Sequence, residues 1–126
     1  MHNQPIQVFG DGTASRDFTY VDTVLDVAMT AMNQRVTSDG AVNLAYGNRI
    51  SLNDTIGLLK QHFPSLQVNY TGERLGDVKE SQNSPELLKK LFPTVQPKEF
   101  AAALSETVTW LNEFGQSVAN GPQTSD

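Results

Sequence analysis

The chain has 126 residues, with nine basic and fourteen acidic side chains, a formal net charge of −5 and no cysteine. This length suits one domain with its own core, and the lack of cysteine excludes disulfides and thiolate metal sites. The acidic balance disfavours nucleic acid as a partner, because nucleic-acid binding needs a dense basic surface. No apolar run is long enough to span a bilayer and no signal peptide is recognisable, so we expect a cytoplasmic protein.

The first part of the chain predicts a strand, a helix and a second strand. Residues 5–9 alternate in polarity, as in a short half-buried strand. Val21–Arg35 is expected to be a helix, with Thr19 and Asp22 able to cap its start. Its apolar residues recur at helical spacing at Val21, Val24, Leu25, Ala28 and Met32. Ala41–Ala45 is a short apolar run typical of a buried strand.

The middle of the chain predicts a helix followed by a strand. Ser51 and Asp54 form a capping box that opens the helix, and Pro64 ends it. Its apolar face consists of Leu52, Ile56, Leu59 and Phe63. Residues 66–70 alternate again and predict a strand.

The last third of the chain predicts two helices. Residues 84–92 form the first, with Ser84 as the N-cap, and the second starts after Pro97. The apolar stripe of the last helix consists of Phe100, Leu104, Val108 and Leu111.

Short strands that alternate with about four helices indicate an α/β or α+β fold. Only three strands are evident, fewer than most sheets contain, so the order of elements is that of part of a larger fold. We expect one domain over residues 5–115, with flexible ends at residues 1–4 and 116–126.

The glycine turn after the first strand differs from known nucleotide-phosphate loops. A dinucleotide fingerprint needs G-x-G-x-x-G between a strand and a helix, but Ser15 stands at the third glycine and no helix begins there. The G-x-x-x-x-G-K-[ST] loop of ATP and GTP sites is also missing from the sequence. We therefore expect no cofactor in this loop.

Arg16 follows this turn and is the first candidate for binding an anion. A guanidinium presents paired donors that match phosphate oxygens. The alternative is an ordinary ion pair with Asp11 or Asp17, which are close in sequence.

A second glycine loop, "TGERLGDV", carries Arg74 and Asp77 just after a predicted strand. The arginine can bind a phosphate while the carboxylate accepts hydrogen bonds from sugar hydroxyls. The alternative is an internal Arg74–Asp77 ion pair that stiffens the loop.

Taken together, "PIQVFGDGTASRDFTYVDTVLDVAMTAM", "VNLAYGNRISLNDTIGLL" and "RLGDV" resemble the C-terminal part of nucleotide-sugar epimerases and dehydratases. These are extended short-chain dehydrogenases, with UDP-glucose 4-epimerase as the best-known member. The resemblance implies a Rossmann-type fold of which this chain is the C-terminal substrate domain, without the N-terminal NAD-binding domain. It fades after Ser81.

The resemblance also implies contacts with a nucleotide sugar, most naturally a UDP-sugar, for six residues. It assigns Arg16 to the pyrophosphate, Arg74 and Asp77 to phosphate and ribose, Val8 and Phe9 to the base, and Asn43 to a place near a phosphate.

Catalysis in this family uses a Tyr-x-x-x-Lys pair and NAD, and neither that pair nor an NAD fingerprint occurs in the sequence. A tyrosine base needs the lysine to lower its pKa toward neutrality. We therefore expect a nucleotide-sugar-binding domain that holds no cofactor and is inactive alone. Two alternatives stay open: a subunit of a split enzyme whose partner chain binds NAD, and a non-catalytic oligomeric or protein-interaction module.

The resemblance finally implies that Val21–Arg35 and Ala41–Ala45 dock on a sheet of the cofactor domain. Without that sheet their apolar faces meet water, at roughly 25 cal/mol per Å². We expect a second copy or a partner chain to cover them, because large apolar patches are rare on monomers.

Overall fold

The computed structural model describes residues 4–79, 81 and 83–119. In chain order its elements are β1 (Ile6–Phe9), β2 (Ser15–Arg16), α1 (Val21–Gln34), β3 (Ile50–Ser51), α2 (Leu52–His62), β4 (Val68–Thr71), α3 (Glu86–Leu91) and α4 (Phe100–Ala119). The predicted mixed fold with about four helices is confirmed. None of the described helices combines the length and apolar character needed to cross a membrane.

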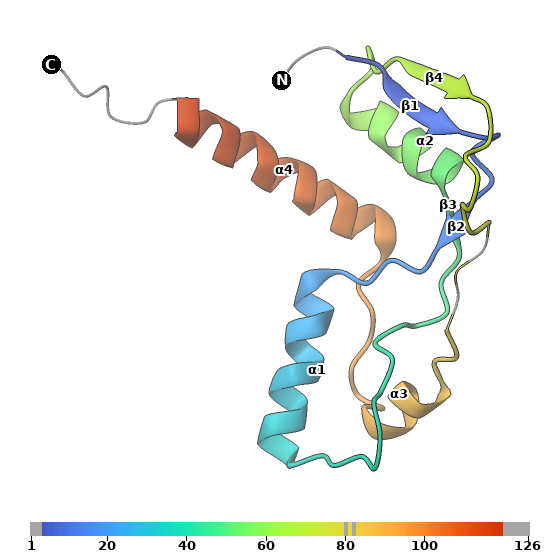
Figure 1. The fold of residues 1–126 in the computed structure, drawn as a ribbon. Helices are drawn as coiled ribbons and strands as arrows, with labels where there is room; N and C mark the ends of the chain where they lie inside the picture. Colours follow the sequence, from blue (N-terminus) through green and yellow to red (C-terminus); the bar gives the residue numbers. More distant parts are fainter. Residues whose placement is uncertain (1–3, 80, 82, 120–126) are drawn as a thin grey trace, which may run out of the picture.

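The four described strands form two separate two-stranded sheets, and the helices lie on either side of the β2–β3 pair (Figure 1). β1 and β4 run parallel, with Val8 opposite Tyr70, and α2 lies beside them. β2 and β3 are antiparallel, with Arg16 opposite Ile50. Figure 1 shows β1, β4 and α2 on one side of the β2–β3 pair, and α1 and α3 on the other. The strands predicted at residues 5–9 and 66–70 are β1 and β4.

A buried hydrophobic cluster, the main cluster, joins α1, α3 and the loops that run between them. Its members are Val27, Tyr46, Leu88, Phe92 and Val95. On the side of the molecule that carries the β1–β4 pair, β1, α2 and α4 contribute the buried residues Val8, Ile56, Ala103 and Val108. In the stripe predicted for α4, Val108 is buried, whereas Leu111 is 42% exposed. Figure 1 shows α4 extending away from the other elements toward its C-terminal end.

The prediction for the start of α1 is wrong in its cap. Tyr20 occupies the N-cap position and makes no side-chain capping bond. The Thr19 hydroxyl donates instead to the Leu44 carbonyl at 3.2 Å, so it ties the helix start to the loop before β3. At the other end the helix stops at Arg35, whose φ of 51° turns the chain out of the helix.

The strand predicted at Ala41–Ala45 is also absent. These residues are neither helix nor strand, because the described chain places no second strand beside them to form a hydrogen-bonded ladder. Their apolar side chains still pack inward, with Ala45 buried and Val42 and Leu44 against the main cluster. The apolar run therefore predicted burial correctly and strand pairing wrongly.

The capping box of Ser51 and Asp54 at the start of α2 is confirmed. α3 begins later than expected, with Pro85 rather than Ser84 at its N-cap. Of the expected flexible ends, only Gln4 and residues 116–119 belong to the described chain, and the latter continue α4.

Candidate functional site

A pocket of about 290 Å³ opens between β1, the first turns of α2 and the loop at residues 72–79. Val8 forms part of its wall and is 3% exposed, while Leu52, Ile56 and Leu59 of α2 supply further apolar lining. Five of the six residues expected to contact a nucleotide sugar line this pocket: Val8, Phe9, Arg16, Arg74 and Asp77. Asn43 is exposed and lies outside it, so a role for Asn43 stays a prediction.

The glycine turn that borders the pocket is fastened to the N-terminus of α2. The N–H groups of Leu52 and Asn53 donate to the carbonyls of Ala14 and Gly12 at 3.1 and 3.0 Å. The next N–H, of Asp54, donates to the Ser51 hydroxyl. These are donors that a helix N-terminus otherwise offers to an anion. The turn uses them, so these N–H groups of α2 are not available to a phosphate in the pocket.

Asn53 and Tyr70 hold the turn in place, and the sequence analysis missed both. The Asn53 amide donates to the Asp11 carbonyl at 3.0 Å, and the Tyr70 hydroxyl donates to Asn53 Oδ1 at 2.9 Å. Gly12 has a φ of +77°, and a Cβ there would lie 2.1 Å from Asn53 Oδ1. The signal was available in "SLND", where an asparagine follows the cap, but only the cap was interpreted.

Arg16 sits on β2, half-buried at the pocket wall, and one guanidinium nitrogen donates to the Ser15 carbonyl at 2.8 Å. The ion pairs proposed as an alternative do not form within the described chain. Asp11 accepts from the N–H and hydroxyl of Thr13, at 2.9 and 2.6 Å. Asp17 accepts from the Gly47 N–H at 2.7 Å. The guanidinium is therefore left with donors that a ligand can use.

The loop carrying Arg74 and Asp77 closes through its backbone. The Asp77 N–H donates to the Arg74 carbonyl at 3.2 Å, and Gly76 supplies the φ of +89° that this turn requires. The Arg74 guanidinium lies 5.6 Å from the centre of the Phe9 ring. An Arg74–Asp77 ion pair is not found in the described part of the chain. Cation, ring and carboxylate thus all line one opening.

The pocket is lined by equal numbers of basic and acidic side chains, but not all of them form ion pairs with one another. Hydrogen bonds from the Thr13 hydroxyl and N–H lower the pKa of Asp11, which keeps that carboxylate ionised and turned toward Thr13. Glu73 pairs with Lys79 at 3.2 Å. Arg16 and Arg74 are the two lining cations that no carboxylate of the described residues neutralises. Two such cations suit a ligand with two phosphoryl groups.

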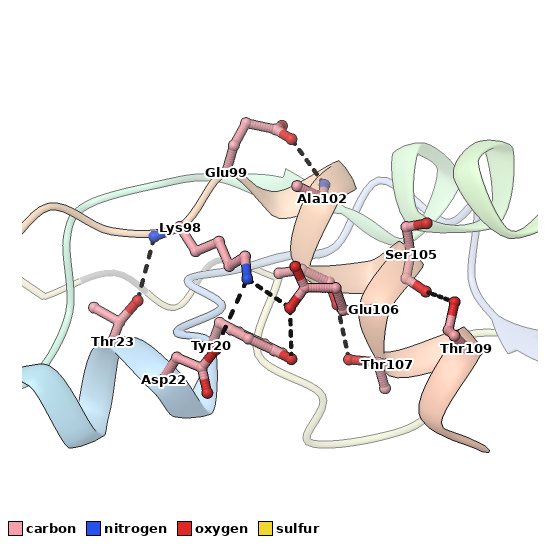
Figure 2. Close-up of polar contacts among 11 residues, drawn as sticks. Tyr20, Asp22, Thr23, Lys98, Glu99, Ala102, Ser105, Glu106, Thr107 and Thr109 are labelled. Atoms are coloured by element: carbon pink, nitrogen blue, oxygen red, sulfur yellow. Dashed lines mark hydrogen bonds and ion pairs between the residues drawn. The ribbon is translucent and has the colours of Figure 1, made fainter. Parts of the chain in front are cut away.

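The segment that joins Arg16 to α1 is clamped by the start of α4. Figure 2 shows Tyr20 and Lys98 converging on Glu106, with Tyr20 donating to it at 3.2 Å. The Lys98 ammonium also lies 5.0 Å from the centre of the Tyr20 ring. Beside this cluster the rings of Phe18 and Phe100 pack with centroids 5.0 Å apart. The side chains of Phe18 and Tyr20 thereby attach the segment after Arg16 to the start of α4.

Lys98 makes two further contacts in the cluster that it forms with Tyr20 and Glu106. The Lys98 N–H donates to the buried Thr23 hydroxyl at 3.2 Å, and its ammonium lies 3.8 Å from Asp22. The hydrogen bond from Lys98 lowers the pKa of Glu106 and raises that of Lys98 itself. Both groups therefore stay charged over a wide pH range.

The described residues contain no group of three or more side chains suited to hold a metal ion.

Comparisons with known proteins relate the chain to a family of nucleotide-sugar enzymes. The model of the NAD dependent epimerase/dehydratase family matches residues 1–45. A UDP-glucuronate 4-epimerase of Thermodesulfobacterium geofontis is 33% identical over 113 residues, which are 87% of this chain and 34% of that protein.

Solved structures agree with this relationship. A UDP-N-acetylglucosamine 4-epimerase from Methanobrevibacter ruminantium, in complex with UDP-N-acetylmuramic acid, superposes with a TM-score of 0.74 at 29% identity, over 88% of this chain and 36% of that one. A UDP-glucose 4-epimerase from Thermotoga maritima, with UDP-glucose, gives 0.78 at 26% identity, over 89% and 36%. The chain thus spans about a third of the length of these relatives.

Proposed function

We propose, from the premise that this chain is related to the NAD dependent epimerase/dehydratase family, that its pocket binds the nucleoside diphosphate of a nucleotide sugar, with UDP-sugars as the preferred class. One observation carries the proposal. Residues from three separate segments, namely β1, β2 and the loop at 72–79, meet in one pocket and bring two arginines without carboxylate partners.

In this proposal each part of the ligand has a matching group. Arg16 and Arg74 bind the diphosphate, since guanidinium and phosphate oxygens pair in two parallel hydrogen bonds. Asp77 accepts hydrogen bonds from the ribose hydroxyls. Val8 and the Phe9 ring, which is 44% exposed, lie along the base. Affinity is expected to be modest, because Arg74 and Asp77 are exposed and binding has to order their loop.

Amide chemical shifts measured during titration with UDP, dTDP and GDP test this proposal. Shifts near Phe9, Arg16 and Asp77 in the wild type, lost in Arg16→Ala and kept in Lys60→Ala, support it. Lys60 is an exposed cation on α2 outside the pocket and controls for net charge. Wild-type shifts that stay absent at millimolar ligand contradict nucleotide binding and favour a protein-interaction module.

We propose further that these 126 residues do not turn over a nucleotide sugar by themselves. The support is their lack of a Tyr-x-x-x-Lys pair and of a glycine-rich dinucleotide loop, since epimerisation needs a base and a hydride acceptor. NAD and the tyrosine would come from another polypeptide segment or chain. UDP-glucose incubated with NAD and this chain alone should stay unchanged, and product in that assay would contradict the proposal. Turnover restored by a co-expressed NAD-binding chain would favour the split enzyme.

The exposed face of α1 supports a partner for this chain. Leu25 and Met32 are 56% and 65% exposed, whereas Thr23 and Val27 on the opposite side are buried. The nearby segment Ala41–Ala45 is neither helix nor strand and pairs with no strand among the described residues. We propose that a second copy or a partner chain covers this region, because burial of such a stripe stabilises an interface.

Sedimentation equilibrium tests this covering partner. The wild type should be larger than a monomer at high micromolar concentration, or should form a mixed complex with a co-expressed NAD-binding chain. Leu25→Gln combined with Met32→Gln should abolish the association, while Gln34→Ala should leave it intact. A wild type that is strictly monomeric and does not bind a co-expressed NAD-binding chain would contradict the proposal. The cytoplasmic location expected from the sequence stays a prediction.

A further inference from the structure

Lys79 is a third cation in the pocket, and its backbone is fixed beside Arg16. The Lys79 carbonyl accepts a hydrogen bond from the Ser15 N–H at 3.0 Å, and the Ser81 N–H donates to the Ser15 carbonyl at 3.4 Å. Ser15 directly precedes Arg16 on β2. The end of the loop is therefore attached to the strand that presents Arg16, although the rest of the loop is exposed.

Glu73 holds the Lys79 ammonium by an ion pair across the loop. Lys79 Nζ and Glu73 Oε1 are 3.2 Å apart, and their side chains are 79% and 71% exposed. Exposed pairs of this kind are worth about 0–1 kcal/mol, so breaking one requires little free energy. Glu73 also covers the glycine turn, since its Cγ would lie 3.6 Å from a Cβ built on Gly10. Glu73 is thus one of the residues that line the pocket.

The other carboxylate at the turn cannot take over this role. Asp11 is engaged by both the N–H and the hydroxyl of Thr13. A diphosphate that enters the pocket would therefore compete for Lys79 with Glu73, the carboxylate that forms an ion pair with it. Its double charge makes it the stronger partner for an ammonium.

We propose that Lys79 is a third diphosphate-binding cation and that Glu73 is a built-in competitor, so that ligand binding exchanges the Glu73 carboxylate for a phosphoryl oxygen. This inference rests on the proposed function of the pocket and adds a regulator to it. The exchange makes affinity depend on a pair that lies within one loop. Glu73 also repels anions that are too weakly charged to displace it.

Calorimetric titration of UDP and uridine into the wild type, Lys79→Gln, Glu73→Gln and the control Lys60→Gln tests the exchange. Lys79→Gln should weaken UDP binding roughly two- to fivefold and leave uridine binding unchanged, as expected for the loss of one exposed charge pair. Glu73→Gln should tighten UDP binding by a similar factor. Lys60→Gln should change the affinities for UDP and for uridine only slightly. Both changes should be smaller than the change in UDP affinity caused by Lys79→Gln.

Two results would overturn the exchange. One is an equal effect of Lys79→Gln and Lys60→Gln on UDP, and the other is weaker UDP binding by Glu73→Gln. The proposed function has its own readout in the same experiment. If the wild type binds UDP, and Arg16→Gln weakens UDP binding while Lys79→Gln does not, only the proposed exchange of Glu73 for a phosphoryl oxygen is contradicted. If wild type binds no UDP, both proposals fail.

Discussion

The half of the molecule that carries the pocket and the half built on α1 and α3 use their apolar residues differently. In the pocket half, Val8 and Ile56 are buried, and the apolar face of α2 lines the ligand opening. In the other half, Leu88 is 2% exposed while the most apolar face of α1 points to solvent. One half therefore uses its apolar residues to line a pocket, whereas the other has a core on one side of α1 and an uncovered face on the other.

Leu88→Ala tests whether the second half contains a true core despite its open face. Removing this side chain should lower the free energy of unfolding by about 2–5 kcal/mol, the range for a fully buried leucine. Urea denaturation gives the value. The neighbouring Leu87 is 44% exposed, so Leu87→Ala should change stability by no more than about 0.5 kcal/mol. Equal effects of the two substitutions would mean that α3 does not pack as described.

Gly12→Ala tests whether the pocket half depends on its turn. The φ of +77° alone makes alanine unfavourable by about 1–2 kcal/mol, and the methyl group would also displace Asn53. Stability and UDP affinity should both fall. The matched control is Gly40→Ala, because a Cβ at Gly40 meets nothing within 4 Å. Unchanged UDP binding by a folded Gly12→Ala variant would show that Asn53 does not position the pocket.

The third prediction concerns the polar cluster that joins the two halves. Lys98 lowers the pKa of Glu106 in the folded state. There is therefore a pH range in which the Glu106 carboxylate is charged in the folded protein but already protonated in the unfolded chain. The resulting stabilisation is present above the ordinary pKa of glutamate and is lost as pH falls through the lowered value. Glu106→Gln should therefore flatten the decline of the urea midpoint on acidification. Glu113→Gln, on an exposed position of the same helix, should leave the decline unchanged.

The sequence predicted the fold where local chemistry decides it. The Ser51–Asp54 box starts α2 because both partners lie within one turn, and β1 follows its own alternation. The apolar run at Ala41–Ala45 failed as a strand because pairing depends on a second strand that no local pattern supplies. The Thr19 cap failed because a distant carbonyl, that of Leu44, competes for the hydroxyl.

For the candidate site, the sequence identified the charged residues but not what fixes them. Arg16, Arg74 and Asp77 are distinctive as types in glycine-rich loops, and all three line the pocket. The asparagine of "SLND" was visible in the sequence, but its partners were not, because Asn53 contacts Asp11 and Tyr70 across 42 and 17 residues of the chain. The Glu73–Lys79 pair was equally invisible, because charge alone does not show which groups face one opening.

The comparison of UDP with uridine, titrated into the wild type and Arg16→Gln, tests the central claim most directly. The two ligands share a base and ribose, so any difference reports on the diphosphate. We predict that the wild type binds UDP more tightly than uridine and that Arg16→Gln weakens UDP binding about tenfold without affecting uridine. Equal affinities for UDP and uridine, or an Arg16→Gln variant that binds UDP like the wild type, would contradict a diphosphate site in this pocket.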